Sequence, residues 1–324
     1  MSFQFPVVFA AWSKDTNNRF CSTSGGIFTE LANSIITNGG LVSGARYNSE
    51  MLVEHCLINN VKDIEQIRQS KYLSSSPGLI FKTIREELSL GKKVLFCGSP
   101  CQVAGLKSFL KKNYDNLITV DFICRGMNSP KAYSFWLNEI EQKNNKKISK
   151  VWFKYKDGGW NSSPTRTKIF FDDKSSIVLV GINNLYMYAY LNSNLFMRPC
   201  CGKCLFKGSN RNSDITLADY WGLDKKIDDD KGTSMVIVNT QQGLDLFNSI
   251  SNRINCVKTD LSLGHNPMFN FSVLLPKERH SFLCDLEKLG FTKCLKKYKG
   301  YPKKQNLFIR FLVKLKHTGK RNGQ

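Results

Sequence analysis

Short β-rich runs alternate with helical patterns along the first half of the chain, and this alternation constrains the fold more than any other feature. The clearest unit starts with PVVFAAW and continues over residues 26–38, where the apolar spacing predicts a helix with Ser24 as its N-cap. A Gly-Gly pair stops this helix before the strand-like LVSGARY. Strands that alternate with helices indicate an α/β fold.

A second unit repeats the alternation. Residues 77–90 predict a helix, KVLFC a strand, residues 102–111 a helix and LITVDFIC a strand. Two cysteines, Cys101 and Cys124, therefore come where strands end and loops begin. Ligand sites in open α/β sheets favour such ends.

The second half has shorter strands and more α+β character. Residues 150–155, 165–171 and 175–180 predict strands, residues 183–195 a helix, and two further buried strands follow in SDITLADYWGL and SMVIVNT. We expect mixed sheets with flanking helices and two intertwined subdomains. The expected regions are an N-terminal α/β region over 1–148, a β-rich region over 149–295, and a basic amphipathic tail over 296–324.

Four cysteines, Cys101, Cys124, Cys201 and Cys204, are candidate metal ligands. Four thiolates gathered from distant segments are what an iron–sulfur cluster needs. Cys201 and Cys204 stand three residues apart, so their two sulfurs can face one metal centre. The other two must arrive by folding, which makes the set a prediction about tertiary structure.

Eleven cysteines in 324 residues could also belong to an oxidised, secreted protein. The total is odd, no basic segment precedes the first apolar residues, and a chain of this length does not need disulfides to fold. We therefore expect a reduced cytoplasmic compartment. The remaining thiols without partners at metal spacing are expected to be small buried hydrophobes: Cys56, Cys256, Cys284 and Cys294.

The formal net charge of +21 favours acidic partners. Residues 296–324 contain ten Lys or Arg and no Asp or Glu, with apolar residues at helical spacing. This tail predicts a basic amphipathic helix that either docks on the body of the protein or binds an anionic membrane surface, peripherally at the inner face. No nucleic-acid recognition motif accompanies the charge, and no apolar run reaches the roughly 18 residues of a membrane span.

Several segments, in a fixed order from about residue 9 to residue 243, carry a family resemblance. They are STSGGIFTELA, QSKYLSS, KVLFCGSPCQVAGLKSFL, LITVDFICRGMNSP, KDGGW, RPCCGKCLFKG, SDITLADYWG and GTSMVIVNTQQG. The chain resembles the beta subunit of coenzyme F420-reducing hydrogenase and its dehydrogenase relatives, a group that includes the 7-hydroxymethyl chlorophyll a reductases. The resemblance implies an oxidoreductase with FAD and one [4Fe–4S] cluster.

Carried over by position, the resemblance assigns the cluster to Cys101, Cys124, Cys201 and Cys204. Cys97 and Cys200 lie beside the motif positions, either as bystanders or as substitute ligands. For the flavin, the resemblance and the local pattern point to a helix start that could receive a pyrophosphate, with Lys71 as the catalytic residue beside a phosphate or the flavin N1 region. The expected cofactor-binding residues are Ser22, Ser24, Gly25, Gly26, Lys71, Asp219 and Trp221.

Two departures from the family pattern matter. Arg125 stands where many relatives have His after the cysteine, which places a positive charge beside the expected cluster. Many relatives also begin with a ferredoxin-like module that this sequence lacks. The resemblance therefore implies electrons from a separate ferredoxin or another redox partner subunit, and an acidic partner would suit the positive charge.

Two functions remain open from the sequence. The first is an oxidoreductase that passes electrons between a ferredoxin-like donor and a small organic substrate. The alternative is a non-catalytic accessory protein of surface-polysaccharide biosynthesis, in which the cysteines hold structural zinc or a stabilising cluster. Phosphate-loop, serine-hydrolase and zinc-protease motifs are missing from the sequence.

Overall fold

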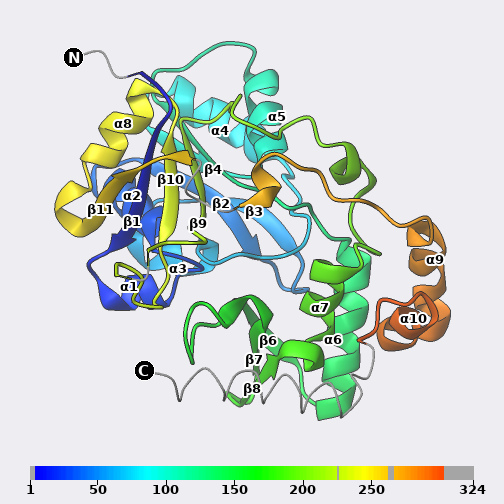
Figure 1. Ribbon diagram of the computed structural model, residues 1–324. Helices are drawn as coiled ribbons and strands as arrows, with labels where there is room; N and C mark the ends of the chain where they lie inside the picture. The colour runs from blue at the N-terminus through cyan, green and yellow to red at the C-terminus, as the bar shows by residue number, and fades with distance from the viewer. Residues whose placement is uncertain (1–3, 225, 262–265, 303–324) are drawn as a thin grey trace, which may run out of the picture.

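A mixed eight-stranded sheet forms the centre of the protein (Figure 1). The computed structural model describes residues 4–224, 226–261 and 266–302. The strand order is β11-β1-β10-β9-β5-β4-β2-β3, so the sheet combines strands from both halves of the chain. The strands are β1 (Val7–Ser13), β2 (Leu41–Tyr47), β3 (Val53–Ile58), β4 (Val94–Cys97), β5 (Leu117–Phe122), β9 (Ile215–Asp219), β10 (Ser234–Val238) and β11 (Ile254–Thr259).

Four neighbouring strands in the middle of this sheet run parallel. β4 pairs in parallel with β2 and with β5, and β5 pairs in parallel with β9. The outer strands pair antiparallel. Because parallel strands finish at the same edge, the segments that follow β4, β5 and β9 meet there, which is where a ligand site is expected.

Helices cover both faces of the sheet. Side chains alternate along β4, so Leu95 packs in a core cluster with α2 (Ile27–Thr37) and α8 (Gln241–Asn248), whereas Val94 and Phe96 pack in another cluster with α4 (Ile80–Ser89) and α5 (Pro100–Leu110). All three β4 side chains are fully buried. The remaining helices of the large sheet are α1 (Thr16–Phe20) and α3 (Ile64–Ile67).

A second, three-stranded antiparallel sheet and four helices gather on one side of the large sheet (Figure 1). They share an aromatic core in which Trp136 and Tyr186 stack with ring centroids 4.8 Å apart and Phe196 lies 5.6 Å from Phe291. These elements are β6 (Ile148–Phe153), β7 (Arg166–Phe171), β8 (Ser176–Val180), α6 (Pro130–Asn144), α7 (Leu185–Asn192), α9 (Arg279–Leu289) and α10 (Phe291–Lys297).

The expected α/β class with mixed sheets and flanking helices is confirmed. Helix α2 occupies residues 27–37 inside the predicted 26–38, and α4 begins three residues later than predicted. The N-cap prediction was wrong: Gly26, with φ 89°, precedes α2, and the Ser24 hydroxyl donates to the Thr233 carbonyl. The sharp left-handed turn at Gly26 replaces a side-chain cap.

The expectation for the unassigned cysteines holds for two of them. Cys56 and Cys294 are buried, whereas Cys256 and Cys284 are exposed. β11 lies at an edge of the large sheet and α9 on the outer side of the aromatic core, so side chains on their outer faces meet solvent. No helix of the described residues is long and apolar enough to cross a membrane. The predicted tail helix lies outside the described residues from residue 303 on.

Candidate active site at the carboxyl edge of the sheet

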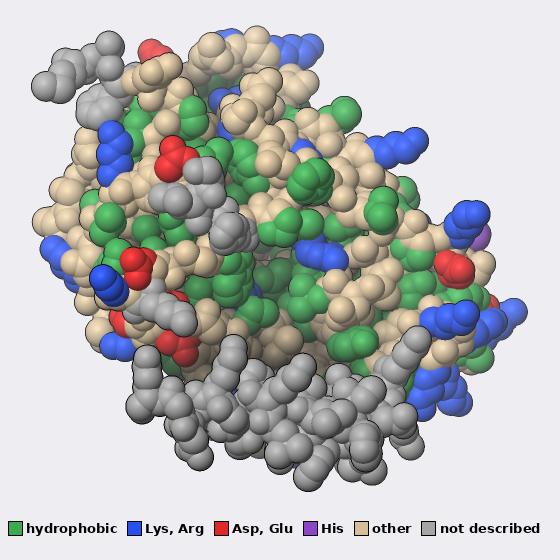
Figure 2. All heavy atoms as spheres, viewed as in Figure 1, with side chains coloured by type: hydrophobic (Ala, Val, Ile, Leu, Met, Phe, Trp, Pro, Cys, Tyr) green, Lys and Arg blue, Asp and Glu red, His purple; other side chains and the backbone are tan. Residues whose placement is uncertain are grey.

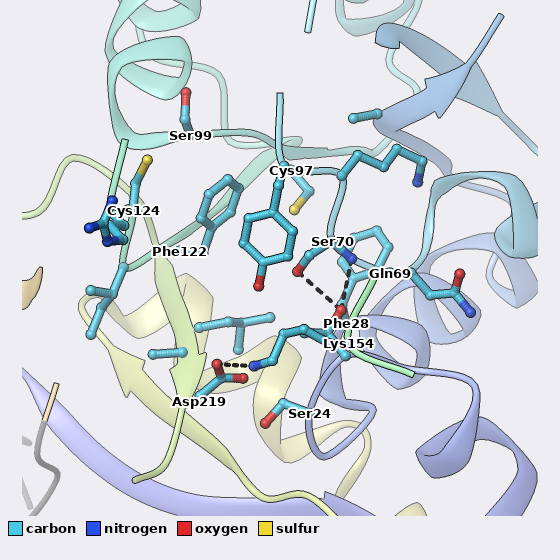
Figure 3. Close-up of a pocket in the computed structure, with 18 of the residues that line it drawn as sticks. Ser24, Phe28, Gln69, Ser70, Cys97, Ser99, Phe122, Cys124, Lys154 and Asp219 are labelled. Carbon is cyan, nitrogen blue, oxygen red and sulfur yellow. Dashed lines mark hydrogen bonds and ion pairs between the residues drawn. The ribbon is translucent and has the colours of Figure 1, made fainter. Parts of the chain in front are cut away.

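A cavity of about 380 Å³ opens at the carboxyl edge of the parallel strands. This volume lies within the range of small-molecule sites. Its walls come from the start of α2, the segment 67–73, the turn after β4, the segment after β5, and the end of β9 (Figure 3). Six of the predicted site residues line it together with one predicted metal ligand: Ser22, Ser24, Gly26, Lys71, Asp219, Trp221 and Cys124.

The start of α2 forms one wall of the cavity. Gly26, Ile27 and Phe28 all line it, and the first N–H groups of a helix have no acceptor within that helix. The positive end of the helix dipole therefore faces the cavity. Gly25 lies behind this wall, where a Cβ would come within 2.4 Å of the Ala11 carbonyl oxygen. Gly25 thus allows the close approach of α2 to β1 and does not line the cavity.

Lys71 lies at the cavity wall with few polar partners. Its Nζ donates to the Arg68 carbonyl at 3.0 Å and lies 5.5 Å from the ring centre of Tyr47. Burial lowers the pKa of Lys71 from 10.5 to about 7, although the nearby Cys56 and Cys97 thiols oppose this shift. An anion bound in the cavity would stabilise the charged form of this lysine.

We expect the pKa of Lys71 to make stability depend on pH. Between about pH 7 and pH 10 the unfolded chain keeps a proton on this lysine that the folded protein has released, so the free energy of unfolding rises with pH. Lys71→Met removes this contribution. Thermal unfolding without added ligand should show the variant more stable than the unmodified protein near pH 7, with a difference that shrinks toward pH 10.

The matched control is Lys82→Met, at an exposed position of α4. The Tm difference that this variant produces should not change with pH over the same window. A Tm difference for Lys71→Met that is equally constant would contradict the buried, cavity-facing environment of Lys71.

The structure adds Lys154, which the sequence did not single out. Lys154 is 2% exposed, forms an ion pair with Asp219, and its Nζ lies 4.9 Å from the ring centre of Trp221 (Figure 3). Trp221 in turn stacks on Trp160 with centroids 4.3 Å apart. The two predicted residues Asp219 and Trp221 thus meet at a buried cation. In the sequence Lys154 is one polar residue in a predicted strand and belongs to no motif, so sequence reasoning could not have identified it as a site residue.

Lys156, two residues further along, lies behind the segment that leads into α2. Its ammonium donates to the carbonyls of Arg19, Ser24 at 2.7 Å and Lys231 at 3.0 Å. Three carbonyl oxygens therefore hold the Lys156 amine, although burial lowers its pKa to about 7. This contact fixes the backbone of the Ser22–Gly26 wall.

Positive charge exceeds negative charge around the cavity. Asp219 pairs with Lys154, and Asp121 pairs with Arg211 at 2.8 Å. Among the described residues, the other cationic side chains of the lining form no ion pair with a carboxylate: these are Arg68, Lys71 and Arg125. The cavity therefore favours an anionic ligand.

The four predicted metal ligands come from three segments that converge beside the cavity. Cys124 follows β5, and Cys101 lies in the first turn of α5, slightly beyond the predicted strand end. Cys201 belongs to a 3₁₀ segment, Pro199–Lys203, and Cys204 follows it. Folding therefore brings the two remote cysteines toward the local pair.

The electrostatic environment of Cys124 shows this convergence. Burial raises the pKa of its thiol to about 12, and the nearby Cys201 and Cys101 sulfurs act in the same direction. Lys207 opposes them, and its Nζ donates to the Cys124 carbonyl at 2.6 Å. Burial likewise raises the pKa of Cys201, with Cys101 among the neighbours that add to the shift.

Backbone and hydroxyl groups also contact these sulfurs. The Met127 N–H donates to Cys201 Sγ at 3.4 Å, and Ser99 Oγ lies 3.2 Å from Cys101 Sγ. In the part of the chain that the structure describes, no three Cys, His, Asp or Glu side chains are arranged closely enough to hold a metal ion. Four thiolates are the donor set that iron–sulfur clusters use, and the assignment of Cys101, Cys124, Cys201 and Cys204 to one cluster stays a prediction.

The two neighbouring cysteines differ in their surroundings. Cys97 lines the cavity at the end of β4, and burial raises the pKa of its thiol to about 12. Cys200 is exposed beside Cys201. Arg125 lines the cavity next to Cys124, donates to Asn194 Oδ1 at 2.7 Å, and lies 4.9 Å from the ring centre of Tyr190.

The fold and this edge of the sheet match a known family. Residues 91–262, more than half of the chain, match the family model for the C-terminal part of the coenzyme F420 hydrogenase/dehydrogenase beta subunit. The chain therefore belongs to this family, whose members are oxidoreductase subunits of the hydrogenase and dehydrogenase type. The family suggested by the sequence motifs is confirmed.

A solved structure shows the same fold. One chain of the F420-reducing [NiFe] hydrogenase complex from Methanosarcina barkeri superposes with a TM-score of 0.53 at 17% sequence identity. The match covers 78% of this chain and 82% of the hydrogenase chain. A search of curated protein sequences gave no match.

Proposed function

We propose that the protein is a flavin- and iron–sulfur-dependent oxidoreductase that passes electrons between a ferredoxin-like donor and a small organic substrate, through FAD and one [4Fe–4S] cluster. One observation carries the proposal: a single cavity extends from the start of α2 to Cys124, whose thiol interacts electrostatically with Cys101 and Cys201. A cofactor in this cavity and a cluster on the four thiols would be neighbours.

The walls of the cavity fit the two ends of FAD. The start of α2, at Gly26, offers N–H groups to a pyrophosphate. The Ser22 and Ser24 hydroxyls lie on the same wall but donate to the Asn18 and Thr233 carbonyls. Lys71 supplies a cation that an anion would keep protonated. Trp221 offers an aromatic surface that the Lys154–Asp219 pair holds in place.

The cysteine side of the site fits a cluster of four thiolates. Cys101, Cys124, Cys201 and Cys204 would hold it, with the Met127 N–H bonded to one of the sulfurs. Bound FAD supplies the chemistry that joins one-electron transfer to hydride transfer. Arg125 lines the cavity next to Cys124 in the chain, and its positive charge favours electron acceptance by a neighbouring cluster.

The relatives support a redox partner. The structural neighbour is a chain of a multisubunit hydrogenase complex, so a chain of this fold assembles there with other subunits. For this chain we propose a separate ferredoxin or another redox subunit as the electron donor. The formal net charge of +21 would attract an acidic protein.

Anaerobic purification tests the proposal directly. We expect a brown protein with visible absorbance from flavin and cluster, about four irons per chain and one flavin. The measurements are the visible spectrum, iron, sulfide and zinc content, and flavin released by denaturation. A colourless protein with stoichiometric zinc would instead support a structural metal site and overturn the oxidoreductase proposal.

A further inference from the structure

Two segments lie side by side at the surface beside the cysteines. The Cys204 N–H donates to Ser272 Oγ at 3.1 Å, and the Gly208 N–H donates to the Phe269 carbonyl at 2.7 Å. Lys207 Nζ also donates to the Met268 carbonyl at 2.8 Å. Residues 202–208 and 268–275 therefore run in opposite directions against each other. We call the surface formed by residues 198–208 and 268–279 the cysteine-loop surface.

Large apolar side chains on this surface point into solvent. Leu205 is 90% exposed, Leu274 is 89% exposed and Phe271 is 66% exposed. Single exposed leucines are common on proteins, but three such side chains on two paired segments form a patch. Figure 2 shows a face of the molecule where green hydrophobic side chains meet solvent among blue Lys and Arg. A patch of this kind is typical of a protein-binding surface.

Exposed basic side chains lie on the same two segments as the apolar patch. Arg198, Lys203 and Lys277 are exposed, whereas Lys207 turns inward to the Cys124 and Met268 carbonyls. The two segments contain a single carboxylate, Glu278. Apolar side chains beside exposed cations fit a partner whose own surface is acidic.

Three cysteines belong to this surface. Cys200 is exposed, and Cys201 and Cys204 are partly exposed. Cys124, in contrast, lines the cavity. A partner on the cysteine-loop surface would therefore approach Cys200, Cys201 and Cys204 from solvent, next to the part of the cavity wall that Met268 forms.

We propose that the cysteine-loop surface docks a small electron-transfer protein with an acidic surface. This inference rests on the proposed function, because a redox partner is needed only if the thiols carry a cluster. Charge argues against two other occupants. A second copy of the chain would bring the same basic residues against this surface, and residues 303–324 contain seven Lys or Arg and no acidic residue.

Binding of a purified acidic bacterial 2[4Fe–4S] ferredoxin to the full-length chain tests the docking surface. Isothermal titration calorimetry should show binding that weakens as salt rises from about 20 to about 200 mM. Phe271→Glu and Leu274→Glu should each weaken it about tenfold or more, since each puts a negative charge at the centre of the patch. Neither residue is adjacent to a predicted metal ligand, so iron content should be unchanged.

Leu90→Glu is the matched control. Leu90 is 73% exposed and follows α4 just before β4 begins, at the edge of the sheet opposite the cysteines. This variant carries the same new charge and should bind the ferredoxin like the unmodified protein. Equal weakening by all three substitutions would mean that net charge alone governs binding and would overturn the proposal.

Iron analysis of the same samples separates the two proposals. A protein that holds iron but does not bind the ferredoxin at low salt would overturn the docking surface and leave the proposed function standing. A protein that lacks iron yet binds the ferredoxin in a Leu274-dependent way would support the surface and overturn the function. A self-associating protein, detected by analytical ultracentrifugation and reversed by Leu274→Glu, would assign the patch to a second copy instead.

Discussion

Cys201→Ser is expected to abolish iron retention by the anaerobically purified protein. A serine hydroxyl is a poor substitute for a thiolate ligand, and Cys201 lies in the group of sulfurs around Cys124. Iron should fall from about four per chain to below about one, with loss of the brown absorbance. Cys124→Ser should have the same effect and, because Cys124 also lines the cavity, should reduce flavin content as well.

Two other cysteines provide controls, one more buried and one more exposed than Cys201 and Cys124. Cys56 is buried on β3 and Cys256 is exposed on β11, and neither is among the cysteines that converge on Cys124. Cys56→Ser and Cys256→Ser should keep their full iron content. If Cys201→Ser retained as much iron as these two variants, Cys201 would not be a ligand, and exposed Cys200 would be the next candidate to replace.

The alternation of strands and helices was enough to predict the class of fold and most of the central elements. β4 and β5 lie within the predicted strands KVLFC and LITVDFIC because buried parallel strands are continuous apolar runs. α6, which begins at Pro130, was not predicted. Few residues of this helix are buried and most are polar, so its apolar pattern is weak. Its aromatic side chains pack against residues distant in the sequence, such as Phe153.

The candidate site was predictable where a motif marks it. Cys124, Lys71 and Asp219 lie in family segments, and the structure places Lys71 and Asp219 in the same cavity as Cys124. Lys154 could not be predicted, because its importance comes from burial and from an ion pair with a strand 65 residues further along the chain. The pairing of segments 202–208 and 268–275 is likewise a property of the fold and leaves no periodic signal.

Asp219→Ala is expected to destabilise the protein strongly. The substitution removes the partner of Lys154, whose side chain is 2% exposed and would remain as a buried, unpaired charge. Breaking a buried ion pair from one side typically costs about 3–5 kcal/mol, far more than the pair itself contributes. Chemical denaturation should therefore show a free energy of unfolding lower by about 3 kcal/mol or more.

Two further variants isolate the cause. Glu287→Ala removes the same kind of group from the exposed ion pair between Lys131 and Glu287 and should leave the free energy of unfolding nearly unchanged, because water screens this pair. Lys154→Met combined with Asp219→Ala should recover most of the lost stability, because an apolar side chain of similar length then fills the site without a charge. If the double variant were no more stable than Asp219→Ala, the loss would come from the Asp219 contacts themselves. If it recovered stability but not flavin binding, the Lys154–Asp219 pair would have a role in holding the cofactor that packing alone cannot replace.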